Sequence, residues 1–410
     1  MTDANSEAFT RLTTADPVLV GVRPAGEVVP GMTAETILTS GAPLPWEAYT
    51  GGQRRAILNA ALYEELAADH QEADAAIREG RIRLGACHEH GCVGSVAGIY
   101  TSSMPVLMVS SARFGNRGFC NLYEGEARKR LNYGAYDEDV RRGLDYLSGS
   151  LGPLLDAAVR RAGGVPLVPI IRRALHMGDE LHSRNTAATL LFSRELFGPL
   201  LELAGDGWDD EARDALAFLR TADYFFLRLS MAAAKVMADA AHGVAGSSLV
   251  TAMTISCREY AIRVSGLGGR WFRGPLPTVE AKLFEGFTED DIEWIGGESH
   301  IAETVGLGGF AQAAAFGLQA YQGGGPEAMV ANNLAMYDIT HGEHPEFKIP
   351  YFGFRGTPTG IDVHQVVATG VVPVIDGGLA GRDGGQIGAG ILKAPLACFI
   401  DAAQALGPGG

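Results

Sequence analysis

The chain has 410 residues, of which 47% are hydrophobic and 20% charged, and this composition is typical of globular proteins rather than disordered ones. Its formal net charge of −15, without a cluster of Lys and Arg, argues against nucleic acid and against a membrane surface as partners. No apolar segment reaches the roughly 20 residues that span a bilayer. The first residues, MTDANSEAF, lack the basic and apolar regions of a signal peptide, so we expect a cytoplasmic protein.

Cysteine and glycine usage narrows the class of protein further. The five cysteines are scattered at positions 87, 92, 120, 257 and 398, which fits reduced thiols better than a disulfide framework. The 55 glycines gather in motifs after Gly85 and again from Gly243 onward. We interpret these motifs as stretches in which backbone amides come close to a ligand.

Residues 1–165 predict an α/β domain. A short buried strand is expected over residues 17–22, a helix over 53–77 and a strongly β-forming strand over 106–109. A further helix begins at residue 137 and continues to residue 161. A stretch rich in glycine and proline then marks the boundary of this domain.

Residues 166–241 predict a helical domain. Helices are expected over residues 175–196, about 209–220 and about 225–241, because apolar side chains recur there at helical spacing. The next segments, over 242–410, are short, β-forming and separated by glycine.

The C-terminal range predicts an α+β domain. It has strands such as 249–253 and 260–264 and helices over 309–321 and 326–337. The chain as a whole is therefore expected to have a mixed α/β (α+β) fold, multi-domain, with a helical middle domain between two glycine-rich α/β domains.

The first candidate site lies in the helix predicted over residues 175–196. Helical spacing groups His176, Glu180 and Arg184 along one stripe, and Asn185 follows directly. A surface helix rarely needs so many polar groups beside an apolar segment that anchors it in a core. We therefore interpret this helix as a wall of an active site.

The sequence His88-Glu89-His90 is the second candidate. On an extended strand the two histidines would project to the same side and could bind one metal ion, with Cys87 or Cys92 as further ligands. The alternative is that one histidine is an acid/base group and the other packs. Because neither CxxC nor HExxH accompanies the pair, we favour the alternative and expect neither a metal nor another cofactor.

A glycine-rich turn after His242 is the third candidate. Ser247 and Ser248 follow its glycines, so the turn could form a nest of backbone donors for an anion, or it could be an ordinary turn of small residues. Arg263 and Arg270 flank the next glycines and are suited either to grip a carboxylate or phosphate or to pair with acidic residues.

Two motifs nearer the C-terminus complete the set. Glu303 lies in a predicted helix whose first turn is glycine-rich, where an acid is favoured by the helix dipole and available as a catalyst. Arg355 and Thr357 lie in a turn that proline makes rigid, which would position an arginine and a hydroxyl donor.

Taken in order, these motifs closely resemble the YlbE-like family, to which the AllG subunit of oxamate carbamoyltransferase belongs. The resemblance rests on the run from His88, HMGDELHSRN, DAAHGVAGSSLVTAM, RVSGLGGRWF, ETVGLGGFAQAAA, RGTPTGIDV and GQIGAGILKAP. It implies a three-part architecture with a helical middle domain. It also implies carbamoyl transfer between carbamoyl phosphate and oxamate, together with FdrA-like and YlbF-like partner subunits.

Such a reaction needs anion grips, donors that polarise a carbonyl and an acid/base group. As acid/base groups we predict His88 and Glu303, followed by His176, Glu180 and His242. As binders of a small anionic substrate we predict Arg263, Arg270, Arg355, Ser247, Ser248 and Thr357. We also expect some of Glu180, His182, Arg184 and Asn185 to line a cleft that the domains share, with Arg184 and Asn185 as substrate binders.

Two other functions fit the same residues. One is a stand-alone amidohydrolase that cleaves a ureido acid in pyrimidine or purine catabolism, since water could replace the second substrate. The other is a scaffold subunit that binds a small ligand without catalysis. In each case we expect a homo-oligomer.

Overall fold

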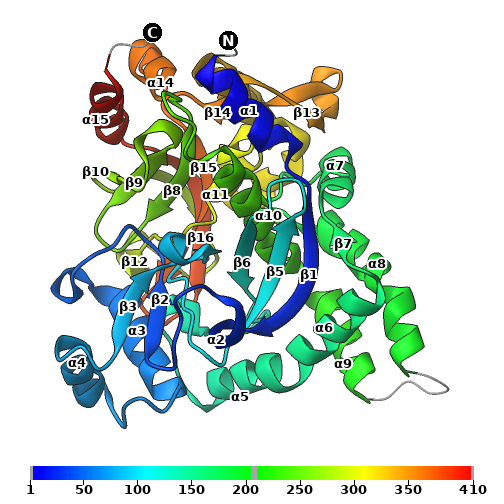
Figure 1. Cartoon of the computed structure of the whole chain (residues 1–410), viewed down its shortest axis with the longest axis vertical. Coiled ribbons are helices and arrows are strands. Elements are labelled where there is room, and N and C mark those ends of the chain that lie inside the picture. Colours follow the sequence, from blue (N-terminus) through cyan, green and yellow to red (C-terminus); the bar gives the residue numbers. More distant parts are fainter. Residues whose placement is uncertain (1–2, 205–209, 408–410) are drawn as a thin grey trace.

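The computed structural model describes residues 3–204 and 210–407, and its centre is a five-stranded sheet of order β4-β6-β5-β1-β7. The strands are β1 (Pro17–Pro24), β4 (Cys92–Val93), β5 (Pro105–Ser111), β6 (Arg117–Asn121) and β7 (Val165–Pro166). Helix α10 (Phe225–Ala241) packs on strands of this sheet (Figure 1). Nearly every residue of α10 is buried, as expected of a helix that is apolar on all sides.

A smaller α/β unit adjoins the central sheet. Its parallel strands β2 and β3 are joined by two helices, which is the crossover that parallel pairing requires. The elements of this N-terminal part are α1 (Ala4–Thr14), α2 (Ala25–Val28), β2 (Thr36–Thr39), α3 (Gly51–Tyr63), α4 (His70–Arg78) and β3 (Arg83–Ala86).

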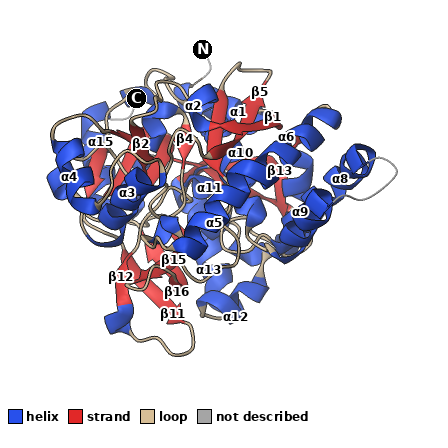
Figure 2. Ribbon diagram, turned by 90° about the horizontal axis from the view of Figure 1, so that it is seen from below, coloured by secondary structure: helices blue, strands red, loops and turns tan. Residues whose placement is uncertain are grey.

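Helices form one edge of the molecule, where α8 and α9 pack side by side (Figure 2). The helices of residues 138–221 are α5 (Glu138–Tyr146), α6 (Gly152–Arg161), α7 (Val168–His176), α8 (Thr186–Ala204) and α9 (Asp210–Thr221). A π turn, Leu147–Leu151, joins α5 to α6.

The C-terminal part contains three small antiparallel sheets, β10-β9-β8, β11-β16-β15-β12 and β13-β14. Their strands are β8 (Val250–Ile255), β9 (Tyr260–Val264), β10 (Phe272–Gly274), β11 (Thr278–Leu283), β12 (Ile292–Trp294), β13 (Thr340–Ile349), β14 (Arg355–Ile361), β15 (Val374–Gly381) and β16 (Gln386–Lys393). The helices are α11 (Ile301–Thr304), α12 (Gln319–Gln322), α13 (Pro326–Met336), α14 (Val363–Thr369) and α15 (Leu396–Leu406).

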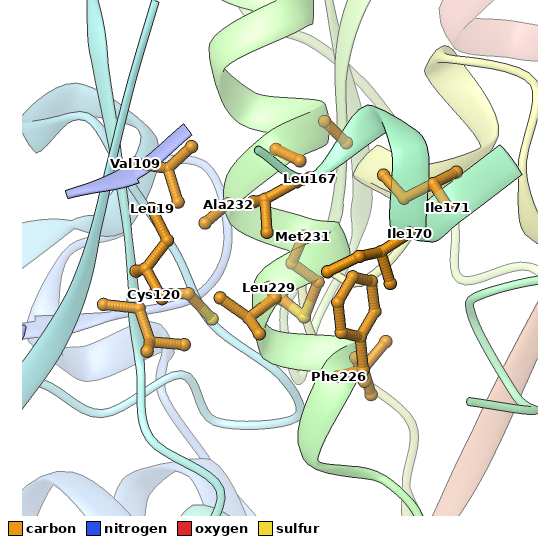
Figure 3. Packing of buried hydrophobic residues seen from close by; sticks show 14 of the residues in the cluster. Leu19, Val109, Cys120, Leu167, Ile170, Ile171, Phe226, Leu229, Met231 and Ala232 are labelled. Atoms are coloured by element: carbon orange, nitrogen blue, oxygen red, sulfur yellow. The ribbon is translucent and has the colours of Figure 1, made fainter. Parts of the chain in front are cut away.

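The largest hydrophobic cluster joins parts of the chain that are far apart in sequence. Figure 3 shows Leu19 and Cys120 of the central sheet on one side of Met231 in α10, with Ile170 of α7 on the other. The same cluster includes Ile301 at the start of α11. The core therefore fixes α10, α7 and α11 relative to one another, and these elements carry the candidate site.

The predicted mixed α/β fold class is confirmed, and the bounds of α10 and β9 are those predicted. The division into 1–165, 166–241 and 242–410 stays a prediction. Among the helices of the described residues, none combines the length and the apolar character that a membrane crossing requires.

Four local predictions are wrong. The helix over 175–196 ends at His176 and restarts only at Thr186. The helix over 53–77 is two helices, because Glu65 takes φ +57° and Asp69 caps a new helix start. Residues 309–321 form short 3₁₀ turns before α12, and residues 87–90 form a 3₁₀ turn rather than a strand.

Candidate active site

The loop of residues 177–185, between α7 and α8, is shaped by a buried carboxylate. Glu180 accepts hydrogen bonds from the backbone N–H groups of His182 (2.5 Å) and Arg184 (2.6 Å). Leu181, between them, has a φ of +72°, which an α-helix does not allow. The polar residues therefore turn around Glu180 instead of forming a helical stripe, and this turn sets the position of His182.

His182 forms a buried pair with Glu303 of α11. Its Nδ1 lies 2.8 Å from Glu303 Oε1, which also accepts hydrogen bonds from the backbone N–H groups of Gly309 (3.0 Å) and Asp376 (3.1 Å). Burial lowers the pKa of His182, but the charge of Glu303 and the hydrogen bond to it outweigh burial, so the pKa is raised overall. A Cβ atom on Gly308 would lie 2.2 Å from Oε1, so glycine is required for this approach.

A second histidine, His300, faces His182 with the two ring centroids 5.8 Å apart. Burial, and then the nearby His182, lower the pKa of His300 to about 3. Within the described residues its buried Nδ1 has no hydrogen-bond partner. His182 therefore holds a proton more readily than His300 does, a difference that suits an acid and a base.

Further carboxyl groups lie behind the histidines. Burial, and then the charge of Glu303, raise the pKa of Asp376 to about 6. Gln312 and Gln322 donate hydrogen bonds to its Oδ1 at 2.6 Å and 3.1 Å. Burial, and then Asp376, raise the pKa of Glu180. Both groups therefore take up a proton more readily than ordinary carboxyl groups do.

A cavity of about 60 Å³ opens beside both histidines, and we call it the inner pocket. The described residues that line it include two arginines, Arg130 and Arg228, and no Asp or Glu. Hydroxyl groups also line it, including those of Ser95, Ser183, Tyr224, Ser299 and Tyr321, which come from five separate segments.

Both arginines of the inner pocket lack an ion pair within the part of the chain that the structure describes. Arg228 of α10 is 5% exposed and donates from Nη1 to the side-chain oxygen of Asn121 (3.1 Å). Arg130 lies over the ring of Tyr133, with 4.8 Å from Cζ to the ring centroid, and donates to the hydroxyl of Tyr123 (3.2 Å). Buried positive charge without a carboxylate partner favours an anionic ligand.

A second buried group, the His88 cluster, consists of His88, Lys235, His242, Arg263 and Glu298. It brings together three residues that the sequence singles out. Both ring nitrogens of His88 are buried without a hydrogen-bond partner among the described residues, and Nε2 lies 4.0 Å from Glu298 Oε1. Burial, followed by the charges of Lys235 and Arg263, lowers the pKa of His88, and burial and then Arg263 lower that of His242 to about 4.

Carboxylates balance the cations of the His88 cluster. Lys235 Nζ lies 2.8 Å from Asp239, and the guanidinium of Arg263 lies 3.6 Å from Asp239 and 3.8 Å from Glu89. Burial raises the pKa of Glu298 to about 8, and its carboxyl accepts the N–H of Gly94 at 2.9 Å. Across the described ranges, no three His, Cys, Asp or Glu side chains are grouped so that they could hold a metal ion.

Comparison with known proteins places this chain in a family. Residues 82–299 match the family model described as oxamate carbamoyltransferase subunit AllG. The chain is 37% identical over 408 residues to the oxamate carbamoyltransferase subunit AllG of Escherichia coli (strain K12), an alignment that covers 98% of this chain and 97% of that protein. The chain belongs to the AllG family.

Two more similarities extend along almost all of this AllG-family chain. It is 40% identical over 398 residues to the uncharacterized protein YahG of Escherichia coli (strain K12), covering 97% of this chain and 84% of YahG. The crystal structure of a conserved protein of unknown function from Enterococcus faecalis V583 matches with a TM-score of 0.94 and 39% identity, covering 98% of this chain and 96% of that one. The predicted family is therefore confirmed.

Some predicted site residues of this AllG-family chain lie outside both buried groups. His176 is exposed, and its ring meets the ring of Phe354 edge-on, with centroids 5.2 Å apart. Arg270 is exposed, and Arg355 is paired at the surface with Glu343 (2.7 Å). The side chains of His176, Arg270 and Arg355 do not line the inner pocket.

The predicted hydroxyl donors have internal partners. Asn5 of α1 donates to the hydroxyl of Ser248 (2.8 Å) and accepts from the hydroxyl of Ser247 (3.0 Å). The hydroxyl of Thr357, buried in β14, lies 3.4 Å from that of Thr359. The serines therefore attach the first helix to the rest of the AllG-family fold.

The structure brings Glu180, Arg184, Asn185 and Glu303 into the immediate surroundings of His182. Residue patterns alone missed four other groups near the inner pocket, which are Arg130, Arg228, His300 and Asp376. Arg228 carries the clearest overlooked signal, because it interrupts the apolar sequence FFLRLSMAAA of α10, where a charge needs a partner or a ligand. The other three lie in segments that only the fold brings together.

Proposed function

We propose that the chain is a catalytic subunit for carbamoyl-group chemistry on a small carboxylate or amide substrate, with the inner pocket as its active site. One observation carries this proposal. Two histidines with pKa values moved in opposite directions, His182 and His300, face a cavity in which Arg130 and Arg228 have no carboxylate partner. Membership of a family described by an oxamate carbamoyltransferase subunit supports the carbamoyl group as the transferred unit.

The arginines would hold the phosphate of carbamoyl phosphate. Both guanidinium groups have N–H donors to spare, since the buried Nε atoms of Arg130 and Arg228 have no partner among the described residues. Charge-assisted hydrogen bonds from arginine to phosphate are among the strongest in proteins. The two side chains would thus orient the donor with its carbamoyl carbon toward the histidines.

The transfer step assigns one role to each histidine. The nitrogen lone pair of the acceptor attacks the carbamoyl carbon, and the bond from that carbon to the phosphate oxygen breaks with its electron pair remaining on phosphate. His182, oriented by Glu303 (2.8 Å), donates a proton to the leaving phosphate oxygen. His300 accepts the proton that the acceptor nitrogen loses, so protons and electrons balance.

FdrA-like and YlbF-like subunits are the proposed partners of this reaction. The test combines the purified chain, alone and with these two subunits, with carbamoyl phosphate and oxamate, and measures phosphate release that depends on oxamate. We expect release in the mixture and its loss in His182→Gln. Activity of the mixture that survives both His182→Gln and Arg228→Gln would identify a scaffold subunit instead.

Hydrolysis is distinguished by a second assay, which measures ammonia. An amidohydrolase would release ammonia from a ureido acid without phosphate, because water would take the place of the second substrate. Such release by the purified chain alone would overturn the transfer reaction.

A further inference from the structure

A recess of about 190 Å³ adjoins the inner pocket, and we call it the outer recess. Ser183, Tyr224 and Tyr321 line both spaces, so the two share one wall. The rings of Tyr224 and Tyr321 lie 5.9 Å apart between their centroids. The polar side chains found only in the outer recess include Arg184, Asn185 and Asp223.

Arg184 has free donors that face the outer recess. Its Nε donates to the backbone oxygen of Gly178 (3.1 Å) and lies 3.5 Å from Asp179. Its two terminal nitrogens have no hydrogen bond to the described residues, and the side chain is 41% exposed. Anchoring through Nε leaves the terminal nitrogens free for the side-by-side contact that a carboxylate accepts.

Hydrogen-bond acceptors lie near this arginine. Asn185 is 1% exposed; its Nδ2 donates to the backbone oxygen of His182 (2.8 Å), and its Oδ1 has no partner within the described ranges. Asp223 adds a carboxylate at the exposed side of the recess. A ligand that satisfies Arg184 as well as these acceptors needs a carboxylate at one end and an N–H group at the other.

We propose that the outer recess binds the acceptor of the transfer reaction, a small monocarboxylate with an amide or amine N–H, while the inner pocket binds the phosphate-bearing donor. The assignment rests on the proposed function and follows the distribution of charge. The inner pocket combines two arginines with no acid, which favours a dianion, whereas Asp223 in the outer recess disfavours one.

The inner pocket and the outer recess meet at one wall. The acceptor nitrogen would form its bond to the carbamoyl carbon at the shared wall of Ser183, Tyr224 and Tyr321. The bond from carbon to phosphate oxygen would break on the inner side of this wall.

The test is a two-substrate kinetic analysis of the chain with its partner subunits, using oxamate and carbamoyl phosphate. In Arg184→Gln we expect the KM for oxamate to rise about 10- to 100-fold, the range for losing a charge-assisted hydrogen bond. The KM for carbamoyl phosphate should change less than about twofold, and Arg184→Lys should recover part of the loss. Arg194→Gln is the matched control, because Arg194 is exposed on α8 and lines a separate hollow.

Two kinetic results would overturn the proposal. One is an unchanged KM for oxamate in Arg184→Gln, and the other is an equal rise in both KM values, which indicates a single shared site. Calorimetric titration of the chain with oxamate separates this proposal from the proposed function. Suppose that the wild-type complex transfers nothing, but oxamate binds and Arg184→Gln weakens its binding at least tenfold. The outer recess would then be supported as the oxamate site, and the transfer reaction would be wrong. Failure of the wild-type chain to bind oxamate overturns the recess.

Discussion

The inner pocket and the His88 cluster each hold two cationic side chains beside histidines, but they balance charge differently. In the His88 cluster, Arg263 lies within 3.6–3.8 Å of two carboxylates. In the inner pocket, Arg130 and Arg228 have no carboxylate within 4.0 Å among the described residues. A cation already matched by an acid gains little from an anion, whereas an unmatched buried cation gains much. Similar residue types therefore support different functions in the two regions.

The two regions are connected by a shared wall. Gly94 donates its backbone N–H to Glu298 of the His88 cluster, while the next residues, Ser95 and Val96, line the inner pocket. In the same way His300 faces the pocket two residues after Glu298. The His88 cluster thus holds segments that line the inner pocket. We expect substitutions in this cluster to change activity mainly by lowering the stability of the fold.

The largest difference in kcat is expected between substitutions of the two buried histidines, His182 and His88. His182→Gln should lower kcat on the order of 10²- to 10⁴-fold, because it removes the proton donor held by Glu303. His88→Gln should keep kcat within about tenfold and lower Tm instead, as typical buried substitutions cost about 0.5–3 kcal/mol. Oxamate-dependent phosphate release and thermal melting measure the two effects. A larger loss of kcat in His88→Gln would reverse the comparison.

A pair of arginines provides the next test. Arg228→Gln should raise the KM for carbamoyl phosphate about 10- to 100-fold, since a charge-assisted hydrogen bond contributes about 1.5–3 kcal/mol. Arg263→Gln should leave this KM within about threefold, because Asp239 and Glu89 already neutralise Arg263. Initial rates over a range of carbamoyl phosphate concentrations measure both. Equal increases in the two variants would contradict the idea that charge compensation separates the regions.

The sequence predicts the elements better than it predicts the site. Its apolar pattern correctly gives the helix over 225–241, because that helix is buried on all sides. It fails over 177–185, where Glu180 bonds to two backbone N–H groups and Leu181 takes a positive φ. Helical spacing carries no information about such a bond, so the polar stripe predicted there does not exist.

Residue chemistry predicts which types of side chain form the site, but it cannot predict which of them lie together. Glu303 contacts His182, for example, although 121 positions separate the two in sequence. Sequence motifs do not point to Arg130 or Arg228, because neither belongs to a glycine-rich motif, and only the fold brings them to one cavity. Convergence of distant segments depends on the packing of the whole core, which no local pattern contains.

Gly308 gives a test that acts on geometry rather than charge. Gly308→Ala should displace Glu303, because the new Cβ atom would lie 2.2 Å from Oε1 at a φ of +58°. We expect an unfolding free energy lower by about 2–3 kcal/mol and a loss of activity with it. Gly324→Ala is the control, with a φ of +72° and no atom within 4 Å of the added Cβ, so it carries backbone strain alone. Equal melting temperatures of the two variants would argue against the tight contact.

The last test concerns a pH dependence of stability that belongs to the His88 cluster. Glu298 has a folded pKa of about 8 against 4.5 for a free glutamate, so the folded state holds a proton that the unfolded state has lost. Stability should therefore fall as pH rises from about 4.5 to about 8, by at most about 1.4 kcal/mol per pH unit. The histidines with lowered pKa values are neutral in the folded state but lose their protons near pH 6.5 in the unfolded state, so they raise stability with pH to the same extent in the wild type and in Glu298→Gln. Urea unfolding measured at several pH values should show the unfolding free energy falling less steeply with pH in Glu298→Gln than in the wild type. The contribution of His182 is also lost as pH rises, but it is the same in both proteins. Parallel slopes would mean that Glu298 is ionised in the folded protein and that the His88 cluster carries an unbalanced negative charge.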